Sequence, residues 1–233
     1  MDMNRYSVIP DKRPREIVLL QGRGCFWRRC AFCDYYHDAQ PDDDAAFALN
    51  SRVLSQVTGQ YGELSVINSG SVFEFDPRTL DLIHTVCLDR GISTLRFESH
   101  WRFRDRIPQL RRDFAPITLK MKVGIETFDF DLRENVWHKG IPERDPRRIA
   151  EGFDEANLLV GVAGQTRASM ERDVDLALSL FERFSVNVMC ANTTPVQPDP
   201  QVIDEFMAHV YPRIVDDPRV DVLIENTDFG VGA

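Results

Sequence analysis

The stretch that decides the fold, residues 22–33, reads GRGCFWRRCAFC. It holds three of the five cysteines, Cys25, Cys30 and Cys33, in a C-x4-C-x2-C arrangement. The apolar run Ile17-Val18-Leu19-Leu20 precedes it, so we expect a loop that leaves the end of a strand. Three thiolates from one loop suit an iron–sulfur cluster, because thiolate is the ligand that such clusters use. A [4Fe–4S] cluster with three cysteine ligands leaves one iron open to bind another molecule.

Other chemistry can use the same cysteines. A structural zinc site needs a fourth Cys or His at compact spacing, and His37 lies four residues after Cys33. A non-catalytic zinc-binding module with three cysteines and His37 is therefore the alternative. Disulfides are disfavoured, because three clustered cysteines cannot all pair with one another and nothing else indicates an oxidising compartment. Inert core cysteines do not suit a loop rich in glycine and arginine, so we favour the cluster.

Composition limits the partners. The chain has 233 residues, 43% of them hydrophobic, which fits one α/β domain with a substantial core. The sequence begins without the apolar segment of a signal peptide and has no run long enough to cross a membrane, so we expect a cytoplasmic protein. A net charge of −9 argues against broad electrostatic binding of nucleic acid. We therefore expect a small-molecule substrate.

Strand and helix patterns alternate along the chain after a polar lead-in at residues 1–15. The expected strands are 16–22, 64–67, 94–99, 119–126, 158–162, 185–191 and 220–224. The expected helices are 45–60, 77–89, 130–137, 146–156, 168–183 and 199–211. Six to seven such repeats predict an α/β fold, a partial (β/α)6-type barrel, as a single domain over residues 1–233 with the cysteine loop at 22–38.

Polar motifs fall where these strands end, which is the edge that carries the chemistry in such barrels. They are Asn68-Ser69-Gly70-Ser71, Glu98-Ser99, residues 124–127, Asn192 and residues 225–228. Within strand 119–126, Lys122 and Glu126 lie on the polar face. That face is either an ordinary wet surface or the lining of an enclosed site, and the parallel strand order favours the site.

With these motifs the chain resembles the radical S-adenosylmethionine (SAM) superfamily. Phe32 stands at the aromatic position before the last cysteine, whereas the first cysteine gap has four residues in place of the usual three. The resemblance implies a [4Fe–4S] cluster on the three cysteines, with SAM on its open iron. It further implies that Phe32 packs on the adenine, that Asn68, Ser69, Gly70 and Ser71 face the methionine, that Glu98 and Ser99 face the ribose, and that Asn192 also contacts SAM.

A narrower likeness is to the branch that contains queuine lyases and the archaeosine synthase lyase subunit. It is carried by residues 67–71, 97–99 and 123–127, together with Leu132-Arg133 and Lys139-Gly140. It implies that queuine base is released from queuosine 5′-monophosphate, with an electron donor such as flavodoxin or ferredoxin. The alternative enzyme modifies a 7-deazaguanine base in tRNA with a partner protein. We assign catalysis to Glu126 and Lys122, and substrate binding to Lys139, Glu225, Asp228 and His37.

Overall fold

The computed structural model of the chain describes residues 4–225, which fall into two compact units. The first unit comprises residues 4–26 and 35–122, and the second comprises residues 27–34 and 123–225. Eight strands, β1 to β8, follow the order of the sequence. Strand β5 (Thr118–Glu126) begins in the first unit and ends in the second. No helix within residues 4–225 is both long and apolar enough to cross a membrane.

The first unit is built on strands β1 (Tyr6–Ile9), β2 (Arg15–Leu19), β3 (Glu63–Ile67) and β4 (Thr94–Ser99). Strand β1 pairs with β2 in antiparallel fashion, whereas the β2–β3 and β3–β4 pairs are parallel. The register aligns Val18 with Val66, and Val66 with Phe97, and all three are buried. Parallel strands with such continuous apolar runs are typical of sheets covered by helices.

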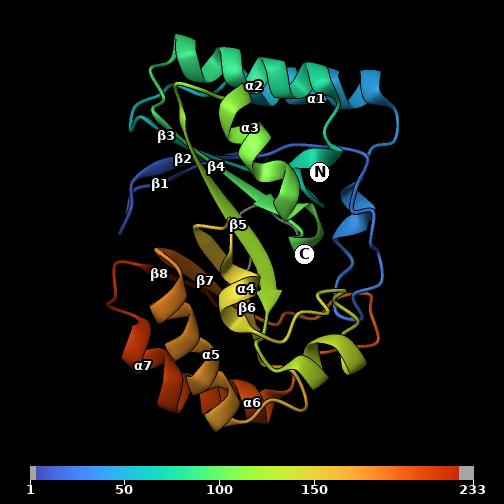
Figure 1. The fold of residues 1–233 in the computed structure, drawn as a ribbon, viewed down its shortest axis with the longest axis vertical. Coiled ribbons are helices and arrows are strands. Elements are labelled where there is room, and N and C mark those ends of the chain that lie inside the picture. Colours follow the sequence, from blue (N-terminus) through green and yellow to red (C-terminus); the bar gives the residue numbers. More distant parts are fainter. Residues whose placement is uncertain (1–3, 226–233) are drawn as a thin grey trace. The chain divides into compact units, whose positions relative to one another are not determined.

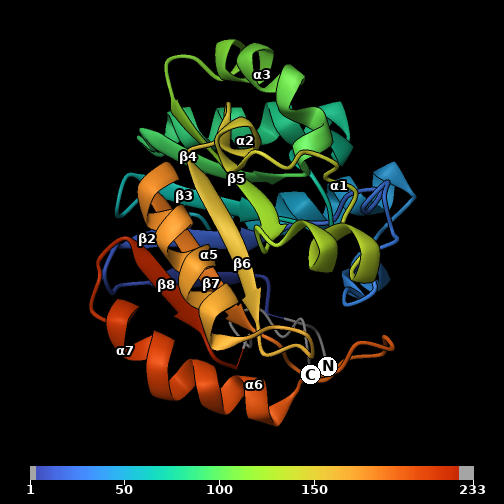
Figure 2. The same cartoon turned by 60° about the horizontal axis from the view of Figure 1, so that its bottom comes forward.

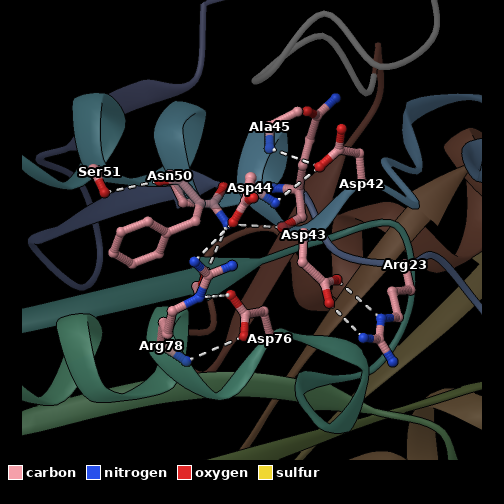
Figure 3. Close-up of polar contacts among 12 residues, drawn as sticks. Arg23, Asp42, Asp43, Asp44, Ala45, Asn50, Ser51, Asp76 and Arg78 are labelled. Atoms are coloured by element: carbon pink, nitrogen blue, oxygen red, sulfur yellow. Dashed lines mark hydrogen bonds and ion pairs between the residues drawn. The ribbon is translucent and has the colours of Figure 1, made fainter.

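Helices α1 (Asp43–Leu54) and α2 (Pro77–Asp89) follow β2 and β3 and lie side by side (Figure 1). Asp42 caps α1, because its carboxylate accepts hydrogen bonds from the backbone N–H groups of Asp44 and Ala45. Arg78 donates to Asp44 and to Asp76, in both cases at 2.8 Å, and so links the starts of the two helices (Figure 3). Helix α3 (Ile107–Asp113) precedes β5 and follows a 3₁₀ helix at Trp101–Arg106.

The second unit contains β6 (Glu155–Val160), β7 (Arg183–Val188) and β8 (Val220–Leu223), which pair in parallel (Figure 2). Helix α5 (Arg167–Leu180) connects β6 to β7 and contacts both strands. The remaining helices are α4 (Pro146–Ala150), α6 (Pro200–Glu205) and α7 (Tyr211–Ile214), with π-helical turns at Asp131–Val136 and Phe206–Val210. Strand–helix–strand alternation therefore continues through this unit, as the sequence predicts.

Several expected elements are confirmed and three are corrected. The helix predicted at 77–89 has these bounds, and the alternation along β5 is confirmed, since Met121, Val123 and Ile125 are fully buried. The prediction of a polar lead-in was wrong for residues 6–9, which form β1. This strand forms because the segment pairs with β2 and because the Tyr6 hydroxyl donates to Glu16 at 2.8 Å. The helix predicted at 45–60 ends at Leu54. The helix predicted at 146–156 ends at Ala150, because Glu155 and Ala156 pair with β7 as the start of β6.

Candidate functional site

The cysteine loop crosses from one unit to the other along the chain. Cys25 belongs to the first unit, whereas Cys30 and Cys33 belong to the second. All five cysteines are thiols, and the three in this loop are partly exposed. Within either unit, no three Asp, Glu, His or Cys side chains among residues 4–225 group as a metal site.

In the first unit, Glu74 holds the start of the loop. Its carboxylate accepts hydrogen bonds from the backbone N–H groups of Phe26 and Ser71, and its backbone oxygen accepts one from the Arg23 N–H at 3.2 Å. Arg23 also donates to Asp43 at the start of α1, at 2.9 Å (Figure 3). Glu74 was not selected from the sequence, because its role depends on Phe26, which lies 48 positions away.

The predicted motif at residues 68–71 lies directly against Cys25. A side chain at Gly70 would place its Cβ 2.9 Å from the Cys25 backbone nitrogen and would collide with the Glu74 carboxylate, so only glycine allows this approach. The buried Ser69 hydroxyl has no hydrogen-bond partner among residues 4–225. A buried hydroxyl without a hydrogen bond destabilises a protein core, so this one fits a position that binds a polar ligand group.

The ends of β3 and β4 are joined in the same unit. The His100 N–H donates to the Ser71 hydroxyl at 2.9 Å, and Ser99 donates to the His100 carbonyl at 3.1 Å. Lys122 lies 3.7 Å from Glu98, and both side chains are partly exposed. The structure thus gathers predicted residues from the ends of β3 and β4 and from the middle of β5 within one unit.

In the second unit, residues 137 and 138 hold the later part of the loop. The Ala31 N–H donates to the Trp137 carbonyl at 3.0 Å, and the Trp27 indole donates to the His138 carbonyl at 2.6 Å. The ring of Phe32 meets the buried ring of Trp137 edge-on, with centroids 5.5 Å apart. The sequence did not predict a role for either tryptophan, because a single aromatic side chain carries no periodic signal.

Asn192 and its neighbour hold the same segment from the end of β7. The Asn192 side chain donates to the Phe32 carbonyl at 2.7 Å. The backbone and hydroxyl of Thr193 both donate to Asp34, each at 2.9 Å. Asn192 therefore fixes the backbone of the aromatic that is predicted to meet the adenine, and its oxygen is occupied by Thr194.

The end of β5 presents a buried ion pair. Lys139 and Glu126 are 2.7 Å apart, with side chains that are 12% and 10% exposed. Burial lowers the pKa of Lys139, but the carboxylate of Glu126 and the sulfurs of Cys30 and Cys33 outweigh it, and the pKa is raised. A Cβ at Gly124 would lie 2.9 Å from the Glu126 carboxylate and 3.1 Å from the Lys139 ammonium, so glycine makes room for the pair.

Glu126 itself adopts a left-handed backbone conformation, with φ of 69°. Non-glycine residues seldom do so, and such strain concentrates at functional positions. The turn that follows is held by Asp173 of α5, which accepts hydrogen bonds from the Thr127 hydroxyl at 2.6 Å and the Phe128 N–H at 2.9 Å. Burial is the main cause that raises the pKa of Asp173 to about 6.

His37, Glu225 and Asp228 are the remaining residues predicted to bind the substrate. His37 is exposed on a 3₁₀ turn of the first unit, and its ring lies 4.4 Å from that of Tyr36. Glu225 is exposed at the end of the described chain, and Asp228 lies outside the described residues. Cys87, outside the cysteine loop, is a buried core thiol, and its burial raises its pKa to about 12.

Comparison with known proteins gives the family. No protein-family model and no curated protein matches the chain. Its structure is similar to that of a queuine lyase from Clostridium spiroforme bound to SAM and queuine, with a TM-score of 0.95, 38% identity and 100% of both chains covered. Streptococcus suis SuiB bound to SAM shares the fold, with a TM-score of 0.56 at 13% identity over 88% of this chain and 49% of SuiB. The chain belongs to the queuine lyase family of radical SAM enzymes and has its α/β partial-barrel fold.

Proposed function

We propose that the protein is a radical SAM lyase that releases queuine base from queuosine 5′-monophosphate. The observation that carries this proposal is the similarity, over the full length of both chains, to a queuine lyase that binds SAM and queuine. The same full-length match supports the prediction that residues 1–233 act as one domain. We further propose that the protein is cytoplasmic, since an exposed iron–sulfur cluster requires reducing conditions.

Cys25, Cys30 and Cys33 would hold a [4Fe–4S] cluster, and SAM would occupy its open iron. The donor set fits, because all three residues are partly exposed thiols in a loop that backbone hydrogen bonds hold at both ends. When bound, the cluster and SAM supply a radical that abstracts hydrogen from a ribose. The protein contributes the binding and orientation of these groups.

The first unit supplies most of the proposed SAM contacts. Residues 68–71 would face the methionine group, and the orphaned Ser69 hydroxyl supports this role because it has donor capacity to spare. Glu98 and Ser99 would face the ribose. In the second unit, Phe32 would pack on the adenine, with Asn192 holding its backbone.

The proposed substrate contacts centre on Glu126. A carboxylate accepts paired N–H donors, which is the pattern on the guanine-like edge of a 7-deazaguanine base. Lys139 is oriented by Glu126 and would bind the substrate phosphate. Lys122 would be the second catalytic group beside Glu126. His37, Glu225 and Asp228 complete the proposed substrate contacts.

Anaerobic reconstitution tests this proposal. We expect a brown protein with about four irons per chain that releases queuine from queuosine 5′-monophosphate in the presence of SAM and a reductant. A panel of 7-deazaguanine nucleosides, nucleotides and modified tRNA separates the proposed substrate from the tRNA alternative. A colourless protein that retains zinc, or turnover only on tRNA, would contradict the proposal.

A further inference from the structure

The first unit carries a group of arginine and aromatic side chains that begins at Phe26, the residue after Cys25. The ring centroids of Phe26 and Phe103 are 5.0 Å apart, and those of Phe103 and Phe73 are 5.4 Å apart. Arg102 stacks on Phe26, with its guanidinium carbon 5.7 Å from the ring centroid, and Arg106 stacks on Phe73 at 4.4 Å. These five residues are named here the arginine–aromatic patch.

The patch has the composition of a protein interface. Phe26 is 41% exposed, and Arg102 and Arg106 are also exposed. A guanidinium that stacks by its face keeps its N–H donors at the edge, where they can meet carboxylates in pairs. Arginine and large aromatics are the residues that dominate binding energy at interfaces, and they lose little side-chain freedom when they are already stacked.

The charge of the patch opposes that of the chain. Residues 101–112 contain five arginines and one aspartate, whereas the whole chain has a net charge of −9. Asp105, the one acidic residue of the segment, is 3.9 Å from Arg104, which itself stacks on Trp101. The net negative charge of the chain would repel an acidic protein, whereas the arginines of the patch would attract it.

We propose that the arginine–aromatic patch docks an acidic one-electron carrier protein that reduces the cluster. This inference rests on the proposed function, which requires an electron from outside the chain. Phe26 is bonded to Cys25, a proposed cluster ligand, so a carrier on the patch is seated at the start of the cluster loop. One electron leaves the carrier, which is oxidised, and the cluster gains it. Opposite charges would also speed the encounter of the two proteins.

A charge-reversal pair tests the docking. In Arg102→Glu/Arg106→Glu, with reduced flavodoxin as donor, we expect the KM for flavodoxin to rise at least about tenfold and its salt dependence to weaken. Titration calorimetry with oxidised flavodoxin should show a similar loss of affinity without any turnover. With dithionite as reductant, SAM cleavage and queuine release should stay at the wild-type rate.

The matched control is Arg52→Glu/Arg90→Glu. Both arginines are exposed, and they lie at the carboxyl ends of α1 and α2, which return to the edge where the parallel strands begin. The control should keep wild-type affinity for flavodoxin. If the reversal variant loses iron, Arg102→Gln/Arg106→Gln replaces it, and a smaller shift in the same direction is expected.

Three results would overturn the docking proposal. The first is an unchanged KM and Kd for flavodoxin in both patch variants. The second is a raised KM for queuosine 5′-monophosphate under dithionite, which would make the patch part of the substrate site. The third is tRNA binding that the reversal abolishes. A wild-type enzyme that cleaves no SAM even with dithionite would instead refute the proposed function, so the two failures are distinguishable.

Discussion

Neutralising Glu126 tests whether the buried ion pair belongs to the site. In Glu126→Gln the ammonium of Lys139 loses its 2.7 Å carboxylate partner while its side chain remains only 12% exposed. Breaking a buried pair on one side costs about 3 kcal/mol. For a chain of this size, 1 kcal/mol shifts the unfolding midpoint by about 2–4 °C, so we expect a loss of about 6–12 °C.

The double variant Glu126→Gln/Lys139→Met supplies the matched control. It removes both charges, so it should recover much of the midpoint that each single variant loses, as a double-mutant cycle by thermal unfolding under anaerobic conditions would show. In the same proteins, SAM cleavage without substrate should persist in Glu126→Gln, whereas queuine release should fall at least about tenfold, or about 1.4 kcal/mol. A midpoint within about 1–2 °C of wild type, the shift of a surface substitution of about 0.5 kcal/mol, together with normal queuine release, would refute the reasoning.

Four further outcomes follow from the site. Single Ala variants of Cys25, Cys30 and Cys33 should lose cluster absorbance, whereas Cys87→Ala and Cys190→Ala should keep it; bleaching of Cys190→Ala would show that the three-ligand assignment is wrong. Phe32→Ala should weaken SAM binding by about 1–3 kcal/mol without loss of iron, and unchanged SAM affinity by calorimetry would reject the adenine contact. Gly70→Ala should reduce iron retention with unchanged circular dichroism, because the new Cβ would lie 2.9 Å from the Cys25 nitrogen; full iron content would show that the approach is not needed. The pKa of Asp173 is raised from 3.8 to about 6, so the folded state binds this proton more tightly than the unfolded state does. The protonated carboxyl therefore stabilises the fold at low pH, and this stabilisation is lost as pH rises through about 6. Between about pH 4 and 7, the free energy of unfolding of Asp173→Asn, measured in urea, should therefore rise by about 3 kcal/mol relative to that of wild type. Parallel pH profiles for the two proteins would contradict the assignment.

Local patterns in the sequence predicted much of the fold. The strands at 94–99 and 119–126 and the helix at 77–89 each have an apolar face whose spacing shows the element and its buried side. Strand β1 was missed, because a four-residue strand beside prolines and charges has too few positions to show alternation. Its formation depends on pairing with β2, which is a tertiary contact.

The candidate site shows the same division between local and distant information. The cysteines and the polar motifs at strand ends could be predicted, since residue type and spacing alone indicate their chemistry. The groups that hold them could not: Glu74 reaches Phe26 across 48 positions, and the Trp27 indole reaches the His138 carbonyl across 111. Several of these contacts use backbone atoms, which every residue possesses, so residue identity alone gives no sign of them.

The hydrogen bond between Phe26 and Glu74 tolerates substitution at one end and not at the other. On the Phe26 side the bonded atom is a backbone N–H, so any residue but proline keeps the hydrogen bond to Glu74. On the Glu74 side the bonded atoms are both carboxylate oxygens, one for Phe26 and one for Ser71, so no other side chain of that length supplies the same two acceptors. Glutamine keeps one acceptor and turns the other into a donor that faces an N–H. Positional control of Cys25 therefore resides in a residue outside the cysteine motif, and its loss would loosen the loop while every thiol remained in place.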